Sequence, residues 1–224
     1  IKDTLKKMGD LYVHIGKVDS GKIKIGQSVN LEINTDRRNN ARAYHSATHL
    51  LHEALRRTLG KHVTQKGSLV SPEKLRFDFS HNKPIDNNEL DRIEKFVNEM
   101  VATSSDVKTR IMTPNEAVDN GALALFGEKY GEEVRVLSMG KEENSFFSTE
   151  LCGGTHVKNT KDIGRFRIVS QSSIASGIRR IEALRGDQLE VYERFLKENK
   201  SNKEKNKIEE INSILKELKS FNVL

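Results

Sequence analysis

The sequence predicts an α+β fold, in which a two-layer α/β domain lies between a small N-terminal β-barrel segment and a long C-terminal helix. Three observations predict this class. Short segments alternate apolar and polar residues, as half-buried strands do, and longer segments repeat apolar residues every three or four positions, as amphipathic helices do. After Gly186 the sequence becomes rich in Lys, Asn and Glu and keeps a helical spacing. We therefore predict three parts, a partial β-barrel segment, a mixed domain and a helical region, which cover residues 1–38, 39–187 and 188–224.

The first part carries strand signals between Leu11 and Ile33. Leu11–Ile15 is an apolar run with β-branched and aromatic residues, and a turn is expected at Asp19–Gly21. We predict part of a small β-barrel or meander here, with a polar break at Asp36–Asn40 before the next element. Beyond the turn, apolar residues alternate with polar ones at Ile23, Ile25, Val29, Leu31 and Ile33.

The middle part is predicted to contain three helices and six strands. Helix Ala41–Leu59 has an apolar stripe, and Gly60 supplies its C-terminal stop. A second helix with the same kind of spacing covers Asn88–Val101. Thr113–Glu116 is a capping box with Pro at the first helical position, so a third helix should run to about Leu125. The strands are expected at residues 69–70, 75–79, 133–139, 145–150, 165–171 and 178–184.

The last part is predicted to be helical from Leu189–Lys197 onward. The Lys-, Asn- and Glu-rich stretch Lys197–Lys207 is expected to be a solvated helix face or a linker. Beyond it, a 3-4-3 spacing of apolar residues predicts either a short coiled-coil seam or an ordinary amphipathic helix. The residues with this spacing are Ile208, Ile211, Leu215 and Leu218.

The composition limits the classes of protein to consider. A chain of 224 residues can bury a proper core. Its 38 Lys and Arg exceed its 32 Asp and Glu, and the net charge of +6 permits a polyanionic partner such as RNA without requiring one. One cysteine and no N-terminal apolar segment predict a reducing, cytoplasmic location, and no apolar run approaches the about 20 residues of a membrane span. Because the chain begins at Ile1 and ends on a helical pattern, we expect it to be part of a longer protein.

Two pairs of potential metal ligands are the most informative feature of the sequence. His45 and His49, four positions apart on a predicted helix, present both imidazoles on one face. Cys152 and His156, four positions apart on a predicted loop, add a thiolate and a third imidazole. Such a set suits tetrahedral zinc, and the single cysteine cannot form a disulfide within the chain. The sequence therefore predicts one zinc site held by His45, His49, Cys152 and His156.

The ligand set leaves two interpretations of the zinc open. Four protein ligands are typical of a structural site, because no position remains for water or substrate. Structural sites usually have closely spaced Cys pairs, however, whereas these ligands are far apart in the sequence and require a folded domain. Gly153 and Gly154 either let backbone N–H groups bind an oxygen-rich substrate or simply make a tight turn. A zinc peptidase is not favoured, because the interval after His45 lacks the Glu of an H-E-x-x-H motif.

Five further polar residues are candidates for contacts near the ion. His52 shares the helix face of the two histidine ligands, either as a partner of the site or as an uninvolved residue. Thr64 and Gln65 follow the helix directly and either reach a pocket beside the ion or belong to a solvated loop. Arg179 and Arg180 are adjacent on a predicted strand and point to opposite faces, so at most one faces a shared phosphate surface. A salt bridge within the fold is an equally good interpretation for these arginines.

Four motifs together resemble the editing domain of the alanyl-tRNA synthetase family. They cover residues 42–52, 65–70, 150–157 and 176–183, and they read RAYHSATHLLH, QKGSLV, ELCGGTHV and SGIRRIEA. The resemblance extends over nearly the whole chain, with a β-barrel before the editing domain and a helical region after it. The threonyl-tRNA synthetase editing domain shares the pattern of histidines and cysteine, but its cysteine loop lacks the Gly-Gly-Thr found here. Freestanding alanyl-type editing proteins share all the motifs.

The resemblance implies hydrolysis of the ester that wrongly joins serine or glycine to tRNA(Ala). It implies one zinc ion on the four predicted ligands, and it makes Gln65 and Cys152 residues whose loss impairs editing. It also places Thr64 near the pocket. The ATP-binding, adenylate-forming site lies in another domain of this family, so this chain should not charge tRNA. A freestanding deacylase and a non-catalytic RNA-binding module held together by zinc remain alternatives.

Overall fold

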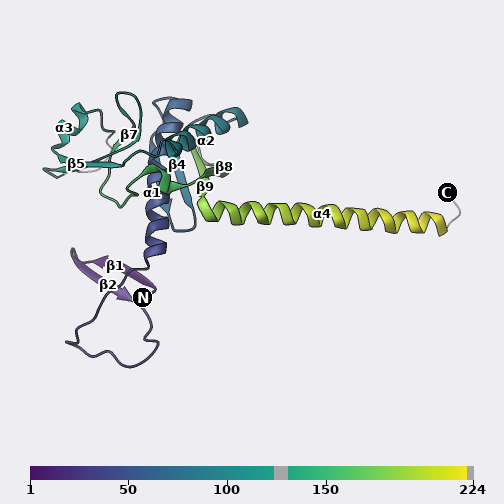
Figure 1. Cartoon of the computed structure of the whole chain (residues 1–224), viewed down its shortest axis with the longest axis horizontal. Helices are drawn as coiled ribbons and strands as arrows, with labels where there is room; N and C mark the ends of the chain where they lie inside the picture. Colours follow the sequence, from purple (N-terminus) through teal and green to yellow (C-terminus); the bar gives the residue numbers. More distant parts are fainter. Residues whose placement is uncertain (124–130, 221–224) are drawn as a thin grey trace. The chain divides into compact units, whose positions relative to one another are not determined.

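The computed structural model describes residues 1–123 and 131–220, and the side chains through residue 214. It confirms the α+β class: helices alternate with small antiparallel sheets, and a long helix follows the last strand (Figure 1). No closed barrel forms among these residues. The chain divides into two compact units, Ile1–Asn34 and Thr35–Leu224.

The first unit contains one hairpin, in which β1 (Asp3–Lys7) pairs antiparallel with β2 (Leu11–Ile15). The predicted strand β2 is present, whereas β1 has a mostly polar sequence and was not predicted. The strand pattern expected for Ile23–Ile33 is wrong, because residues 16–34 form no strand and Ile23 and Leu31 are 68% and 66% exposed. A segment with alternating apolar and polar residues forms a strand only where it finds a partner strand and a surface to pack against. An isolated hairpin supplies little of either.

Helix α1 (Thr35–Leu59) begins earlier than the sequence pattern indicated. The polar break expected at Asp36–Asn40 is wrong, because these residues form the first turns of α1. The Asp36 carboxylate lies in the first turn, where the helix dipole favours an anion. The Asn40 side chain accepts a hydrogen bond from Arg185 at 3.0 Å. The end of the helix was predicted correctly: Gly60 has a φ of 120° and donates its N–H to the Arg56 carbonyl.

A four-stranded antiparallel sheet forms the main scaffold, in the order β3–β4–β9–β8. In its central pair Phe77 lies opposite Ile181, and Asp78 lies opposite Arg180 on the other face. Phe77 and Ile181 belong to the main core, to which α1 and α2 contribute their apolar stripes. The strands are β3 (Gln65–Val70), β4 (Leu75–Ser80), β8 (Phe166–Ala175) and β9 (Ile178–Arg185), and the second helix is α2 (Asn87–Ala102).

A three-stranded sheet delivers the second half of the candidate site. It has the order β5–β6–β7, with β5 (Lys108–Met112), β6 (Val134–Lys141) and β7 (Phe146–Leu151). Strand β7 leads directly into Cys152, as predicted, whereas β5 was not predicted. The capping box of α3 (Pro114–Asp119) is present, but the helix ends well before Leu125, which lies outside the described residues. Gly121, with a φ of 76°, follows its C-cap and turns the chain away.

The C-terminal helix α4 (Gly186–Ser220) is continuous, so Lys197–Lys207 is a solvated part of the helix and not a linker. It follows a 3₁₀ turn, η1 (Thr160–Ile163), and strands β8 and β9 in the chain. Ile208 and Ile211 are more than half exposed, and the side chains of Leu215 and Leu218 lie outside the described residues. None of the helices in the described part of the chain combines the length and apolar character that a membrane crossing requires.

Candidate metal centre

The structure brings together the side chains of His45, His49, Cys152 and His156. Their potential ligand atoms all lie within 4.8 Å of one another. The two histidines of α1 are one helical turn apart, with ring centroids separated by 5.1 Å. Cys152 follows the last residue of β7, and His156 returns to the same point after a short loop, with its ring centroid 4.3 Å from that of His45. Two segments separated by about a hundred residues therefore converge on one point.

The separations within the cluster fit a tetrahedral metal ion. The Cys152 Sγ lies 3.3 Å from His156 Nε2 and 3.6 Å from His45 Nε2. Zinc bonds of about 2.0–2.1 Å to nitrogen and about 2.3 Å to sulfur place tetrahedral N and S ligands about 3.6 Å apart. His49 Nε2 is buried and has no hydrogen-bond partner in the described part of the chain, as expected of a nitrogen that faces an ion. Three imidazoles and one thiolate are a donor set that zinc accepts.

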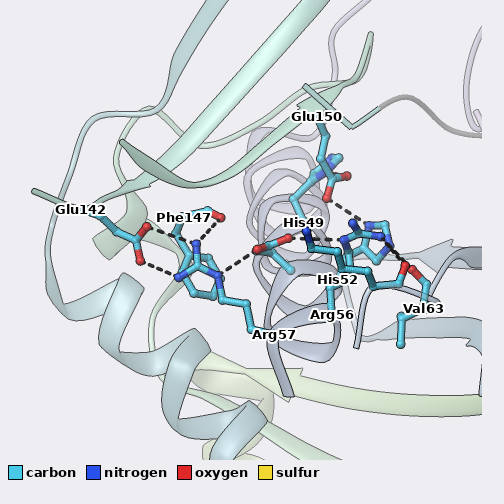
Figure 2. A network of polar contacts seen from close by, with 10 residues as sticks. His49, His52, Arg56, Arg57, Val63, Glu142, Phe147 and Glu150 are labelled. Carbon is cyan, nitrogen blue, oxygen red and sulfur yellow. Dashed lines mark hydrogen bonds and ion pairs between the residues drawn. The ribbon is translucent and has the colours of Figure 1, made fainter. Parts of the chain in front are cut away.

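The Glu150 carboxylate contacts two histidines of α1, His49 and His52 (Figure 2). Its Oε2 lies 2.7 Å from His49 Nδ1, and its Oε1 lies 3.0 Å from His52 Nδ1. When His49 Nδ1 donates to this carboxylate, Nε2 is the nitrogen free to bind a metal. Glu150 is 5% exposed and was not singled out as a site residue from the sequence. One available signal was its position two residues before Cys152, which puts both on one side of an extended strand.

His156 is oriented from the helix side by Ser46. The Ser46 Oγ lies 3.2 Å from His156 Nδ1 and also accepts the N–H of Val157 at 3.2 Å. His156 Nε2 is then directed at the Cys152 sulfur. For His49 and His156, the nitrogen away from the cluster contacts a polar side chain, the arrangement typical of metal-binding histidines.

The charges around the cluster favour a cation. Burial raises the pKa of the Cys152 thiol, but hydrogen bonds from His156 and His45, together with the charge of His49, outweigh burial and lower the pKa to about 3. Burial lowers the pKa of His49, but the Glu150 carboxylate and Cys152 raise it to about 10. Burial lowers the pKa of His156 to about 4. The centre thus contains a thiolate beside a buried carboxylate, and both attract a positive charge.

The two glycines of the cysteine loop differ in their surroundings. A Cβ on Gly154 would lie 2.7 Å from His45 Nδ1, so that position has no room for a side chain. The Gly154 carbonyl also accepts a hydrogen bond from the Arg135 guanidinium. A Cβ on Gly153 would meet no other atom within 4 Å. Close packing against His45 therefore explains Gly154, while Gly153 lies beside open space.

The other candidate residues lie in the four-stranded sheet or just before it. Thr64 is half-buried, and its hydroxyl lies 2.9 Å from the Ser80 hydroxyl. Gln65 is the first residue of β3, beside an irregularity in the pairing with β4. Arg180 forms two hydrogen bonds with Asp78, at 2.7 and 2.8 Å, and Arg179 donates to a side chain of β8. The alternative of a salt bridge within the fold therefore describes Arg180.

Comparison with known proteins first finds a similarity for one segment of the domain. Residues 134–182 match the family described as the threonyl and alanyl tRNA synthetase second additional domain. The matched segment includes strands β6 to β8, the first part of β9 and the loop with Cys152 and His156.

The chain is also similar over most of its own length to curated alanine–tRNA ligases. The chain is 58% identical over 193 residues to an alanine–tRNA ligase of Parvibaculum lavamentivorans and 57% identical over 192 residues to one of Mesorhizobium japonicum. These matches cover 85% and 84% of this chain but 22% of each relative. An alanine–tRNA ligase of Granulibacter bethesdensis is 54% identical over 208 residues, which cover 90% of this chain and 24% of that relative. The resemblance to the alanyl-tRNA synthetase family is confirmed, and the chain corresponds to about a fifth of the length of these relatives.

Proposed function

We propose that this chain is the editing segment of an alanine–tRNA ligase and hydrolyses Ser-tRNA(Ala), and also Gly-tRNA(Ala), at a zinc site. The observation that carries the proposal is the convergence of three imidazoles and one thiolate in a chain similar to alanine–tRNA ligases. The proposal places the reaction in the cytoplasm, with mischarged tRNA(Ala) as the partner. No part of the proposed role requires this chain to bind ATP or to charge tRNA.

A separate hydrolytic site answers a limit of molecular recognition. A charging pocket shaped for alanine cannot strongly exclude glycine, which is smaller, or serine, which adds only a hydroxyl. A second site that removes wrong products is the general remedy. To spare alanyl esters, that site needs a polar group that the serine hydroxyl satisfies and the alanine methyl does not. Such a polar group selects for serine, whereas glycine has no hydroxyl to satisfy it.

We assign the metal to His45, His49, Cys152 and His156, with Glu150 and Ser46 fixing the orientation of two of these histidines. Bound zinc supplies a fixed positive charge that can position the aminoacyl end and polarise its ester carbonyl. Because all four ligands come from the protein, we favour positioning and electrostatics over a zinc-bound hydroxide. We propose that Gly153, beside open space, lets the loop backbone approach the substrate, with Gly154 keeping the loop against His45.

We further propose that Thr64 and Gln65 recognise the serine hydroxyl. The Thr64 hydroxyl is anchored by Ser80, and such an anchored group can accept or donate a further hydrogen bond. The expected result for Thr64→Val, which keeps the shape and removes the hydroxyl, is a loss of preference for seryl over alanyl esters. Gln65→Ala should slow the hydrolysis of Ser-tRNA(Ala). For the RNA contact, Arg179 is the better candidate of the pair, because Arg180 is already bonded to Asp78 at two positions.

The direct test is the release of serine from preformed Ser-tRNA(Ala), with Ala-tRNA(Ala) as the control and metal content measured on the same sample. We expect one zinc per chain and faster release of serine than of alanine. Equal rates for the two esters would refute selective editing. When a histidine of the cluster is replaced by alanine in this assay, His14→Ala is the matched control, because His14 lies in the first unit and outside the cluster.

A second candidate function is an RNA-binding module that zinc holds together without hydrolysis, and the fully protein-ligated cluster favours it. Cys152→Ala separates the two functions if circular dichroism shows that the chain remains folded. Loss of deacylation with tRNA binding retained supports the enzyme, and loss of tRNA binding alone supports the module. A freestanding deacylase remains the alternative within the same chemistry, and the length of the native reading frame distinguishes it.

A further inference from the structure

A pocket of about 340 Å³ adjoins the metal cluster on its His156 side. His156 and Val157 form one wall, and side chains from the first turns of α1 form another. The pocket exceeds the roughly 300 Å³ at which small-ligand sites begin. The remaining lining residues are Asn39, Arg42, Lys158 and Asp162.

The helix wall of this pocket continues the face that carries the metal ligands. Asn39, Arg42, His45 and His49 follow one another at intervals of three, three and four residues, which places them along one face of α1. Arg42 is therefore one turn before the first ligand on the same face. A molecule that reaches the cluster along this face passes Arg42.

The opposite wall is held in place by hydrogen bonds. The N–H of Val157 donates to Ser46, and the Lys158 carbonyl accepts the N–H of Val107 at 2.9 Å. The Asn159 side chain accepts from the N–H of Lys161 at 3.0 Å and donates to the Ser104 carbonyl at 2.9 Å. The backbone that carries Lys158 is thus fixed before any ligand arrives, which lowers the entropic cost of binding.

The charged groups of the pocket match a nucleotide better than a simple anion. Among the described residues, neither Arg42 nor Lys158 forms an ion pair, and the hydrogen bond of Arg42 goes to the neutral Asn39 at 3.3 Å. Two cations without a carboxylate partner attract a phosphate. Asp162, which also lines the pocket, opposes a bare anion, but a carboxylate can accept a hydrogen bond from a ribose hydroxyl.

We propose that this pocket binds the sugar–phosphate backbone beside the 3′-terminal ester of the RNA, with Arg42 and Lys158 on the phosphate and Asp162 on a ribose hydroxyl. The inference rests on the proposed function, because it takes the ester to lie at the cluster. It adds the path by which the RNA end arrives: along the N-terminal turns of α1, past Arg42, to His156. Arg42 and Lys158 then contribute to binding of the substrate and not to the hydrolytic step.

The test compares two esters that differ by one cytidine nucleotide and its phosphodiester, 3′-O-seryl adenosine and the seryl ester of the dinucleotide cytidylyl-adenosine. The wild-type chain should prefer the dinucleotide ester. Arg42→Gln and Lys158→Gln should each lower kcat/KM for the dinucleotide ester about tenfold, mainly through KM, since each removes one charge-assisted hydrogen bond. Both should leave the adenosine ester unaffected. The matched control, Lys95→Gln on the exposed side of α2, should change neither.

A binding measurement keeps this test separate from the test of editing. An RNA hairpin with a free single-stranded CCA 3′ end is titrated by fluorescence anisotropy at several salt concentrations, and zinc content is measured for each variant. Arg42→Gln and Lys158→Gln should weaken binding and lower the slope of log Kd against log salt by about one, with zinc retained. If the wild type binds the RNA in this way but hydrolyses no ester, the pocket stands and the editing function fails. Equal losses on both esters, unchanged binding in both variants, or no RNA binding by the wild type would overturn the pocket.

Discussion

Helices α1 and α4 have the same kinds of apolar and charged residues, yet they have different environments. In α1, apolar residues such as Leu50 and Leu51 are fully buried, and so are polar ones such as Ser46. In α4, Leu189 is buried near the start, whereas Phe195 and Ile211 are more than half exposed. The apolar spacing predicts a helix in both cases. The difference lies in the packing: strands of both larger sheets contact α1 and bury its apolar face, which forms the core and the site.

The largest difference between the two helices should appear when apolar side chains are shortened. Leu51→Ala in α1 should lower the free energy of unfolding by about 2–5 kcal/mol, because it leaves a cavity in the main core. Ile211→Ala in α4 should change it by less than about 0.5 kcal/mol, because that side chain already contacts water. Urea titration followed by circular dichroism measures both. Equal losses would mean that α4 is covered in solution.

A smaller effect should distinguish buried from exposed carboxylates. Glu150→Gln keeps the side-chain shape but leaves one carbonyl oxygen for two histidines, so at least one loses its acceptor. We expect zinc affinity to fall about 10–100-fold, measured by competition with a chelator. The matched control is Glu198→Gln, which changes an exposed carboxylate of α4. Unchanged affinity in the Glu150 variant would show that His49 needs no support from that side.

The smallest effect is expected where α4 meets the sheet. A hydrogen bond from Arg165, with a second contribution from Arg167, lowers the pKa of Glu193 below its ordinary value of 4.5. A carboxyl group whose pKa is lower in the folded state stabilises the fold above its unfolded pKa, and this contribution is lost as the pH falls through the folded value.

Glu193→Gln should therefore lower the Tm slightly at neutral pH and by less under acid conditions, where the wild type has also lost the contribution. Thermal melts at pH 7 and pH 3 measure the difference. The effect should remain small because Arg167 is exposed and Glu193 is only partly buried, so that water and salt screen the pair. A loss that is larger at pH 3 than at pH 7 would contradict the assigned sign.

The cluster could be predicted from the sequence because ligand spacing is a local property. His45 and His49 need only a helix, and Cys152 and His156 need only a short loop. Glu150 was not singled out as a site residue, since its position two residues before Cys152 does not show that it faces two histidines from another element. The N-terminal turns of α1 were missed for the same reason: Asn40 finds its partner in Arg185, 145 residues away. Conversely, Ile23–Ile33 alternates correctly but has no strand to pair with.

Because each half of the cluster comes from a different end of the domain, an ion bound there would also report on folding. Neither half can complete the coordination until β7 has docked on α1, which it contacts in the folded chain. Cobalt(II) could replace zinc as a coloured probe. The absorption bands of cobalt(II) held tetrahedrally by the thiolate and the three imidazoles would appear only after the docking step. A refolding experiment followed by that colour would time the docking step without any added label.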